Sequence, residues 1–188
     1  MLKKITLMLF LLLPATPLHA QDQNYAPFGL SWGTSVKQIE AAGVTLELVE
    51  ENFYQTASLP ANADWAETYI LYIDKKQGLV RVAAYTGNIL NDPSGQMGKR
   101  MYFRLRGELE HVFVRIGSQE NDAATPGIAV PPEMSFYTCL DSGPCGSWFS
   151  NFVSGDVNAQ LILETLDAEA GYISIIYENN ALVRKMKK

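Results

Sequence analysis

The stretch WAETYILYIDKKQGLVRVAAYT, residues 65–86, decides the fold class of this 188-residue chain. Its two halves, 65–74 and 79–86, are rich in β-branched and aromatic residues, and the polar sequence DKKQG joins them at 74–78. Strand-forming runs that flank a short turn containing glycine are typical of a β-hairpin. We therefore predict a pair of antiparallel strands here.

The sequence after this hairpin predicts the longest helix of the chain, over about residues 96–116. The segment NDPSG at 91–95 breaks the strand pattern, Ser94 is a candidate N-cap, and Gly117 is the expected end. An apolar stripe at spacings of three and four residues runs through Met97, Met101, Leu105, Leu109, Val112 and Ile116. We expect this stripe to pack on a sheet.

The remaining elements are expected to be mostly short strands with hairpin-length connections. Strand-like runs occur at 44–49, 53–58, 134–138, 147–153, 158–166 and 172–178, and short helices are expected near 36–42 and 181–186. Residues 118–132 are predicted to form a long loop, and loops of this length are often functional. The pattern predicts an α+β fold: a mainly antiparallel sheet of about 6–8 strands with the long helix packed on one face.

Residues 1–20 have the features of a secretory signal peptide. Lys3 and Lys4 precede an apolar run at 5–13, and Leu18-His19-Ala20 ends in a small residue at the expected cleavage site. The run is too short for a membrane span of about 20 residues, and an uncleaved N-terminal anchor is the alternative. We therefore expect a periplasmic or secreted protein, cleaved near Ala20, whose residues 21–188 form a single globular domain.

The charge of the chain bears on the kind of partner it takes. The formal net charge is −5, and without Lys3 and Lys4 the count is 13 basic against 20 acidic residues. A resulting charge of about −7 disfavours binding to nucleic acid, which needs a basic footprint. A basic protein partner would suit this charge, and an ordinary solvated surface is the alternative.

The two cysteines, Cys139 and Cys145, are separated by the five residues LDSGP. In an oxidising compartment such a pair predicts a disulfide. Metal sites and thioredoxin-like redox sites are the alternatives, but both typically use CxxC spacing. We therefore expect a structural disulfide, no metal and no cofactor.

The sequence offers little catalytic chemistry. His111 is the single histidine of residues 21–188, and we interpret it as a surface or half-buried residue of the long helix. No P-loop, dinucleotide-binding or zinc-protease motif is present. A hydrolase built on carboxylates is the alternative, with Glu67, Asp141 and Glu164 as candidate acids.

Aromatic residues and the disulfide loop indicate where a partner would bind. Trp32, Trp65 and Trp148 each lie near a turn or the end of an expected element, where a tryptophan is either an exposed anchor or a core residue. A loop tied by a disulfide is a rigid surface that costs little entropy to order on binding. The candidate binding surface therefore comprises Asp141, Ser142 and Trp148 near the disulfide with Asn121 and Asp122 of the 118–132 loop.

The stretch FGLSWGTS at 28–35, followed by Ile39 and Gly43, resembles the opening of many small exported bacterial proteins. These proteins share a Trp-Gly-x-Ser turn that leads into a short helix. The resemblance implies a bacterial source and an α+β domain, and it carries over no catalytic residue. The Ser142-Gly143 pair is similar to the Ser-Gly loop of some lysozyme inhibitors, but the tyrosine that ends that loop is missing here.

These observations together predict an exported, non-catalytic binding protein of the inhibitor, immunity or envelope-accessory type, which acts through contact with another protein. Two alternatives stay open. One is the carboxylate-based hydrolase, acting on envelope polymer, which requires a cleft that holds two acids. The other is a carrier of a small apolar ligand, in which the sheet and the long helix enclose an apolar cavity.

Overall fold

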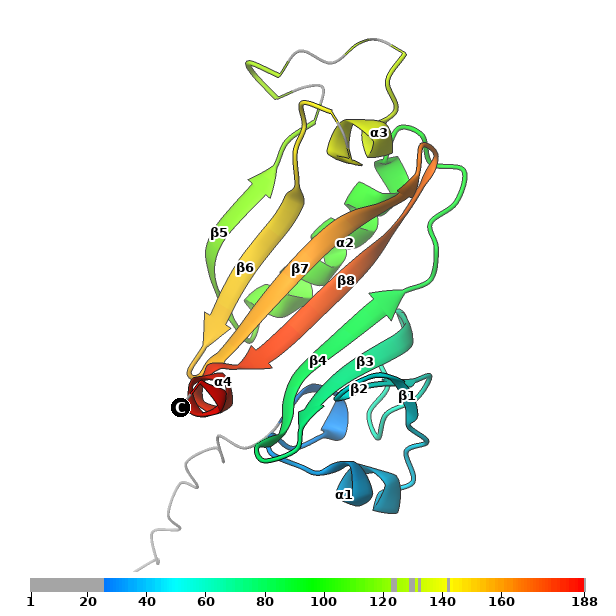
Figure 1. The fold of residues 1–188 in the computed structure, drawn as a ribbon. Coiled ribbons are helices and arrows are strands. Elements are labelled where there is room, and N and C mark those ends of the chain that lie inside the picture. The colour runs from blue at the N-terminus through cyan, green and yellow to red at the C-terminus, as the bar shows by residue number, and fades with distance from the viewer. Residues whose placement is uncertain (1–25, 123–124, 129–130, 132, 142, 188) are drawn as a thin grey trace, which may run out of the picture.

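The computed structural model describes residues 26–122, 125–128, 131, 133–141 and 143–187. The predicted signal peptide and Ser142 lie outside the described residues. Within them the chain forms an antiparallel sheet of eight strands in the order β1-β2-β3-β4-β8-β7-β6-β5 (Figure 1). The predicted α+β fold is confirmed. No helix in the described part of the chain is long and apolar enough to cross a membrane.

The order of the elements divides the sheet into two halves. The first half contains η1 (Pro27–Gly29), α1 (Val36–Ala41), β1 (Glu47–Glu50), β2 (Phe53–Thr56), β3 (Ala66–Asp74) and β4 (Gly78–Thr86). The second half contains α2 (Gln96–Glu110), β5 (Val114–Glu120), α3 (Phe136–Asp141), β6 (Trp148–Ser154), β7 (Val157–Asp167), β8 (Ala170–Asn179) and α4 (Asn180–Met186). Four strands follow one another in each half, and the two halves join where β4 pairs with β8.

A buried row of side chains crosses the sheet and defines its covered face. Cross-strand pairing aligns neighbouring members of this row, which comprises Leu71, Val82, Tyr177, Ala159 and Phe152. All five belong to the hydrophobic core. Because side chains alternate between the two faces of a strand, the row shows which face is buried. α2 packs on that face, together with residues 26–35, here called the N-terminal segment (Figure 1).

The hairpin predicted at residues 65–86 is formed by β3 and β4. Asp74 stabilises its turn, because the Asp74 Oδ1 accepts hydrogen bonds from the backbone N–H groups of Lys76 (2.9 Å) and Gln77 (2.7 Å). Gly78 ends the turn with a φ of 70°, and a Cβ at this position would collide with the backbone of Gly33. The turn therefore requires glycine, and it lies directly against the N-terminal segment.

The long helix is shorter than its apolar stripe predicts. α2 ends at Glu110 and residues 114–120 form the edge strand β5, so the predictions of a helix to 116 and of a loop from 118 are wrong at these positions. Val112 and Ile116 are 68% and 63% exposed. The β-branched residues at 112, 114 and 116 favour a strand, and pairing with β6 supplies the hydrogen bonds.

The predicted strand at 134–138 is also wrong, because residues 136–141 form the helix α3. Ser135 precedes this helix, and its Oγ accepts a hydrogen bond from the backbone N–H of Thr138 at 3.1 Å, as an N-cap does. A short apolar run fits a strand or a buried helix equally well by periodicity. The serine cap was the local signal that distinguishes the two.

Candidate functional site

Hydrogen bonds fasten the N-terminal segment to the start of β4. The backbone N–H of Gly33 donates to the carbonyl of Leu79, and the N–H of Leu79 donates to the carbonyl of Thr34, both at 2.9 Å. Further upstream, the Phe28 carbonyl accepts a hydrogen bond from the N–H of Ala61 at 3.0 Å. These bonds fix the position of the aromatic residues between them.

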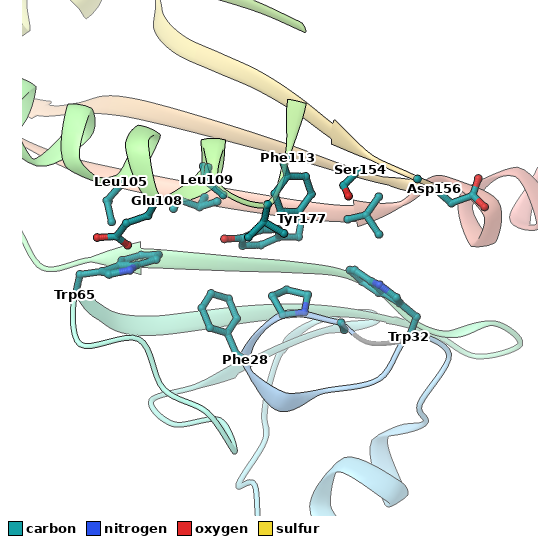
Figure 2. Close-up of a pocket in the computed structure, with 16 residues that line it drawn as sticks. Phe28, Trp32, Trp65, Leu105, Glu108, Leu109, Phe113, Ser154, Asp156 and Tyr177 are labelled. Carbon is teal, nitrogen blue, oxygen red and sulfur yellow. The ribbon is translucent and has the colours of Figure 1, made fainter. Parts of the chain in front are cut away.

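A cleft of about 960 Å³ lies between this segment and α2 (Figure 2). Figure 2 shows Phe28, Trp32 and Trp65 on one side of the cleft, with α2 on the other. The lining is mainly apolar and includes Leu105, Leu109, Val112, Phe113, Ile175 and Tyr177. A concave space of several hundred Å³ with such walls is typical of a site for a small ligand.

Phe28 is the centre of an aromatic cluster in this cleft. Its ring makes edge contacts with the rings of Tyr69, Tyr177 and Trp65, at centroid separations of 5.0, 5.7 and 6.3 Å. Phe28 has a φ of 61°, and a bulky residue keeps this left-handed conformation only where its surroundings hold it. The packing of the ring therefore outweighs a backbone strain of about 1–3 kcal/mol.

Two carboxylates line the cleft, at opposite ends (Figure 2). Asp156 Oδ1 accepts a hydrogen bond from Arg184 Nη2 at 2.9 Å. Glu108 Oε1 lies farther from its neighbouring cation, 4.0 Å from Arg104 Nε, and the Glu108 side chain is 54% exposed. Burial and, secondly, the charge of Glu108 raise the pKa of Tyr177. The Glu108 end of the cleft therefore carries the less compensated negative charge.

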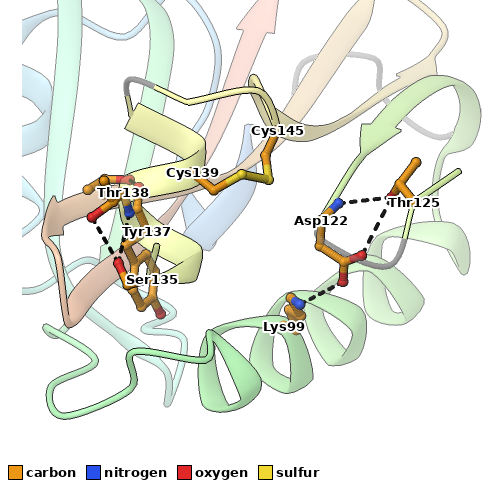
Figure 3. The surroundings of a disulfide bond; sticks show 9 residues. Lys99, Asp122, Thr125, Ser135, Tyr137, Thr138, Cys139 and Cys145 are labelled. Carbon is orange, nitrogen blue, oxygen red and sulfur yellow. Dashed lines mark hydrogen bonds and ion pairs between the residues drawn. A yellow bond between two sulfur atoms is a disulfide. The ribbon is translucent and has the colours of Figure 1, made fainter. Parts of the chain in front are cut away.

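The predicted disulfide joins Cys139 and Cys145 (Figure 3). Their Cα atoms are 5.2 Å apart, and both residues are buried. The backbone N–H of Cys145 also donates to the Cys139 carbonyl at 3.2 Å. An intramolecular disulfide indicates a non-reducing compartment of the extracellular type.

Trp148, which the sequence allowed as either an exposed anchor beside the disulfide or a core residue, lies in the core. It is 3% exposed, and its ring contacts those of Phe136 and Tyr102 at centroid separations of 5.2 and 6.1 Å. The reason is that Trp148 opens β6 on the covered face of the sheet, where it pairs with Leu163. The side chain is therefore unable to contact a partner directly.

Of the other residues predicted to form the binding surface, one is exposed and two are half-buried. Asp141 is exposed at the end of α3, whereas Asn121 and Asp122 are half-buried. Asp122 forms an ion pair with Lys99 at 2.7 Å, and its backbone N–H donates to Thr125 Oγ1 at 2.9 Å (Figure 3). Binding of a protein partner by these residues stays a prediction.

The candidate catalytic acids lie on different elements. Glu67 is on β3, Asp141 ends α3, and Glu164 is on β7, where its Oε1 accepts a hydrogen bond from Ser174 Oγ at 2.7 Å. His111 is exposed at the C-cap of α2. None of these four residues lines the cleft. Across the described ranges, no group of three or more His, Cys, Asp or Glu residues is placed to hold a metal ion.

Comparison of the chain with protein-family models, curated proteins and solved structures gave no match. The cleft is therefore interpreted from its own geometry. Sequence reasoning selected Trp32 and Trp65 as core or interface residues, but it missed Phe28, Glu108 and Tyr177. The FGLSWG segment was a signal for Phe28, because it places two aromatic residues four positions apart before a helix. Glu108 and Tyr177 carried no comparable local signal.

Proposed function

We propose that this protein is a non-catalytic binding protein of a non-reducing compartment, which holds an apolar ligand in the cleft between its N-terminal segment and α2. This is the carrier alternative that the sequence left open. The observation that carries it is the aromatic cluster around Phe28, which lines a cleft of about 960 Å³. Preformed apolar walls with few polar groups are the usual form of a small-ligand site.

The geometry favours this function over the two others considered. Binding of a protein partner through the disulfide loop is less favoured, because Trp148, the aromatic residue expected to contact the partner, is buried. A hydrolase of the glycosidase type needs two carboxyl groups that flank one bond. The cleft carboxylates instead lie at opposite ends, and Asp156 is engaged by Arg184.

The test is a titration of the purified protein with N-phenyl-1-naphthylamine, a neutral apolar dye whose fluorescence rises in an apolar environment. We expect saturable binding to one site, weakened by Trp65→Leu, because this change removes an aromatic wall of the cleft. Phe103→Leu is the matched control, since Phe103 is an exposed aromatic residue outside the cleft lining. Dye binding that is equal in both variants and the wild type would contradict the proposal.

A further inference from the structure

We propose that the ligand carries a positively charged group, an organic ammonium on an apolar body, and that this group binds at the Glu108 end of the cleft. The inference rests on the proposed function and adds the chemical class of the ligand. Three features carry it: the aromatic faces at this end, the charge of Glu108, and the way in which the protein uses its own cations elsewhere.

The aromatic rings at this end form a surface suited to a cation. Trp65, Phe28 and Tyr177 are linked by edge contacts at centroid separations of 6.3 and 5.7 Å. A cation within about 6 Å of an aromatic face is attracted by the negative charge of that face, most strongly for tryptophan. Figure 2 shows the Glu108 carboxylate and the Trp65 ring at the same end of the cleft. A cation bound at this end would therefore have both a carboxylate and an indole ring among the groups that line its site.

The charge of the lining has one sign. Among the described residues the cleft is lined by two acidic side chains, Glu108 and Asp156, and by no lysine or arginine. Arg184 compensates Asp156 at 2.9 Å, whereas Arg104 approaches Glu108 only to 4.0 Å. Because the carboxylate also acts on Tyr177, whose pKa is raised partly by its charge, its field reaches into the cleft. This field attracts a cation and opposes an anionic ligand.

The protein's own cations stack on other rings. Lys99 Nζ lies 4.3 Å from the ring centroid of Phe136, and the Arg106 guanidinium lies 4.7 Å from that of Phe103. Both contacts involve α2 residues outside the cleft lining. Cation–π contacts are therefore a device that this protein uses on α2 itself, outside the cleft.

The test compares three probes that share one apolar body: 3-phenylpropylammonium, 3-phenylpropanol and 3-phenylpropanoate. Binding is measured from chemical-shift changes of the indole N–H signals in ¹H–¹⁵N NMR spectra of the full protein. We expect the cation to bind about three- to thirtyfold more tightly than the alcohol, the range of an exposed ion pair together with a cation–π contact. The carboxylate probe should bind most weakly.

Two variants locate the charged group. Glu108→Gln should abolish the preference for the ammonium probe while the alcohol still binds. Glu110→Gln is the matched control, because it removes the same charge from the same helix at a residue that faces Arg115 and does not line the cleft. It should leave the preference unchanged.

The outcomes separate this inference from the proposed function. Equal binding of ammonium and alcohol, both weakened by Trp65→Leu, would overturn the cation preference and leave the apolar site standing. A preference that Glu108→Gln does not change would also overturn it. Absence of binding by all three probes at millimolar concentrations would overturn both proposals.

Discussion

At the residue scale, Asp92 is the buried carboxylate that organises the start of α2. Its Oδ2 accepts hydrogen bonds from the backbone N–H of Gly98 at 2.9 Å and from the Tyr137 hydroxyl at 3.1 Å. A negative charge is favourable at a helix N-terminus, where backbone N–H groups lack partners. Burial and the charge of Asp92 raise the pKa of Tyr137. One side chain thus ties α2 to α3.

Asp92→Ala is expected to lower the free energy of unfolding by about 2–4 kcal/mol, because it leaves the buried Tyr137 hydroxyl and an α2 N–H without their acceptor. Tyr137→Phe removes a single hydrogen bond and should cost about 1 kcal/mol. Urea unfolding followed by circular dichroism measures both. If the alanine variant costs no more than the phenylalanine variant, Asp92 does not have this role.

At the element scale, Glu120 joins α2 to the edge of the sheet. Both of its carboxylate oxygens accept hydrogen bonds from Arg106 Nη1 at 2.8 Å. Its Oε1 also accepts from Ser150 Oγ at 3.1 Å and from the Tyr102 hydroxyl at 3.3 Å. Because Tyr102 and Arg106 lie on α2, Ser150 on β6 and Glu120 on β5, the network links three elements.

Glu120→Ala should therefore destabilise the protein by about 1–3 kcal/mol, since Arg106 and the Ser150 hydroxyl lose an acceptor while the Tyr102 hydroxyl keeps its 2.8 Å bond to Ser150. The matched control is Glu110→Ala, which breaks ion pairs with Arg115 at 3.0 Å and, more loosely, with Arg106 at 3.9 Å, and should cost less than about 1 kcal/mol. Thermal and urea unfolding compare the two. Equal losses of stability in the two variants would show that the Glu120 network contributes no more to the free energy of unfolding than an ordinary surface ion pair.

Whether an element depends on local or on distant contacts explains which parts of the fold could be predicted from the sequence. The hairpin of residues 65–86 and the Cys139–Cys145 disulfide depend on neighbours in the chain, so local patterns sufficed for both. The end of α2 depends on a competition that the helical stripe does not contain, because Val112 and Ile116 fit a helix pattern while β6 offers a strand to pair with. Contacts between residues far apart in the chain, those of β5 with β6, therefore decide between helix and strand at these positions.

The candidate site was less predictable for a similar reason. Trp32 and Trp65 could be selected as aromatic residues near turns, but their partners Glu108 and Tyr177 come from α2 and β8. No pattern in the sequence joins these positions. The burial of Trp148 likewise follows from its register against Leu163, which is set by the pairing of β6 with β7.

At the scale of the whole molecule, buried tyrosines make the fold sensitive to alkali. Burial is the largest cause that raises the pKa of Tyr102, Tyr137 and Tyr177 well above the ordinary value. Tyr102 lies on α2, Tyr137 on α3 and Tyr177 on β8, so the effect extends over several elements of the core. In the unfolded chain these groups titrate near their ordinary pKa of about 10.

A pKa that is raised in the folded state contributes stability below the unfolded pKa, and this stability is lost as the pH rises further. We therefore expect the free energy of unfolding to fall as the pH increases above about 10. Phenolate absorbance should rise abruptly when the protein unfolds. Tyr177→Phe should make the decline less steep. A gradual rise of phenolate absorbance for all tyrosines near pH 10, with the fold intact, would contradict this expectation.

The most direct test of the binding cleft uses the three tryptophans of the chain as reporters. Trp32 and Trp65 line the cleft, whereas Trp148 lies outside the lining and packs against Phe136. In ¹H–¹⁵N spectra recorded during titration with 3-phenylpropylammonium, the indole N–H signals of Trp32 and Trp65 should shift along one saturation curve while that of Trp148 stays in place. A titration in which Trp148 shifts as much as the other two, or in which none of the three shifts, would contradict the assignment of the cleft as the binding site.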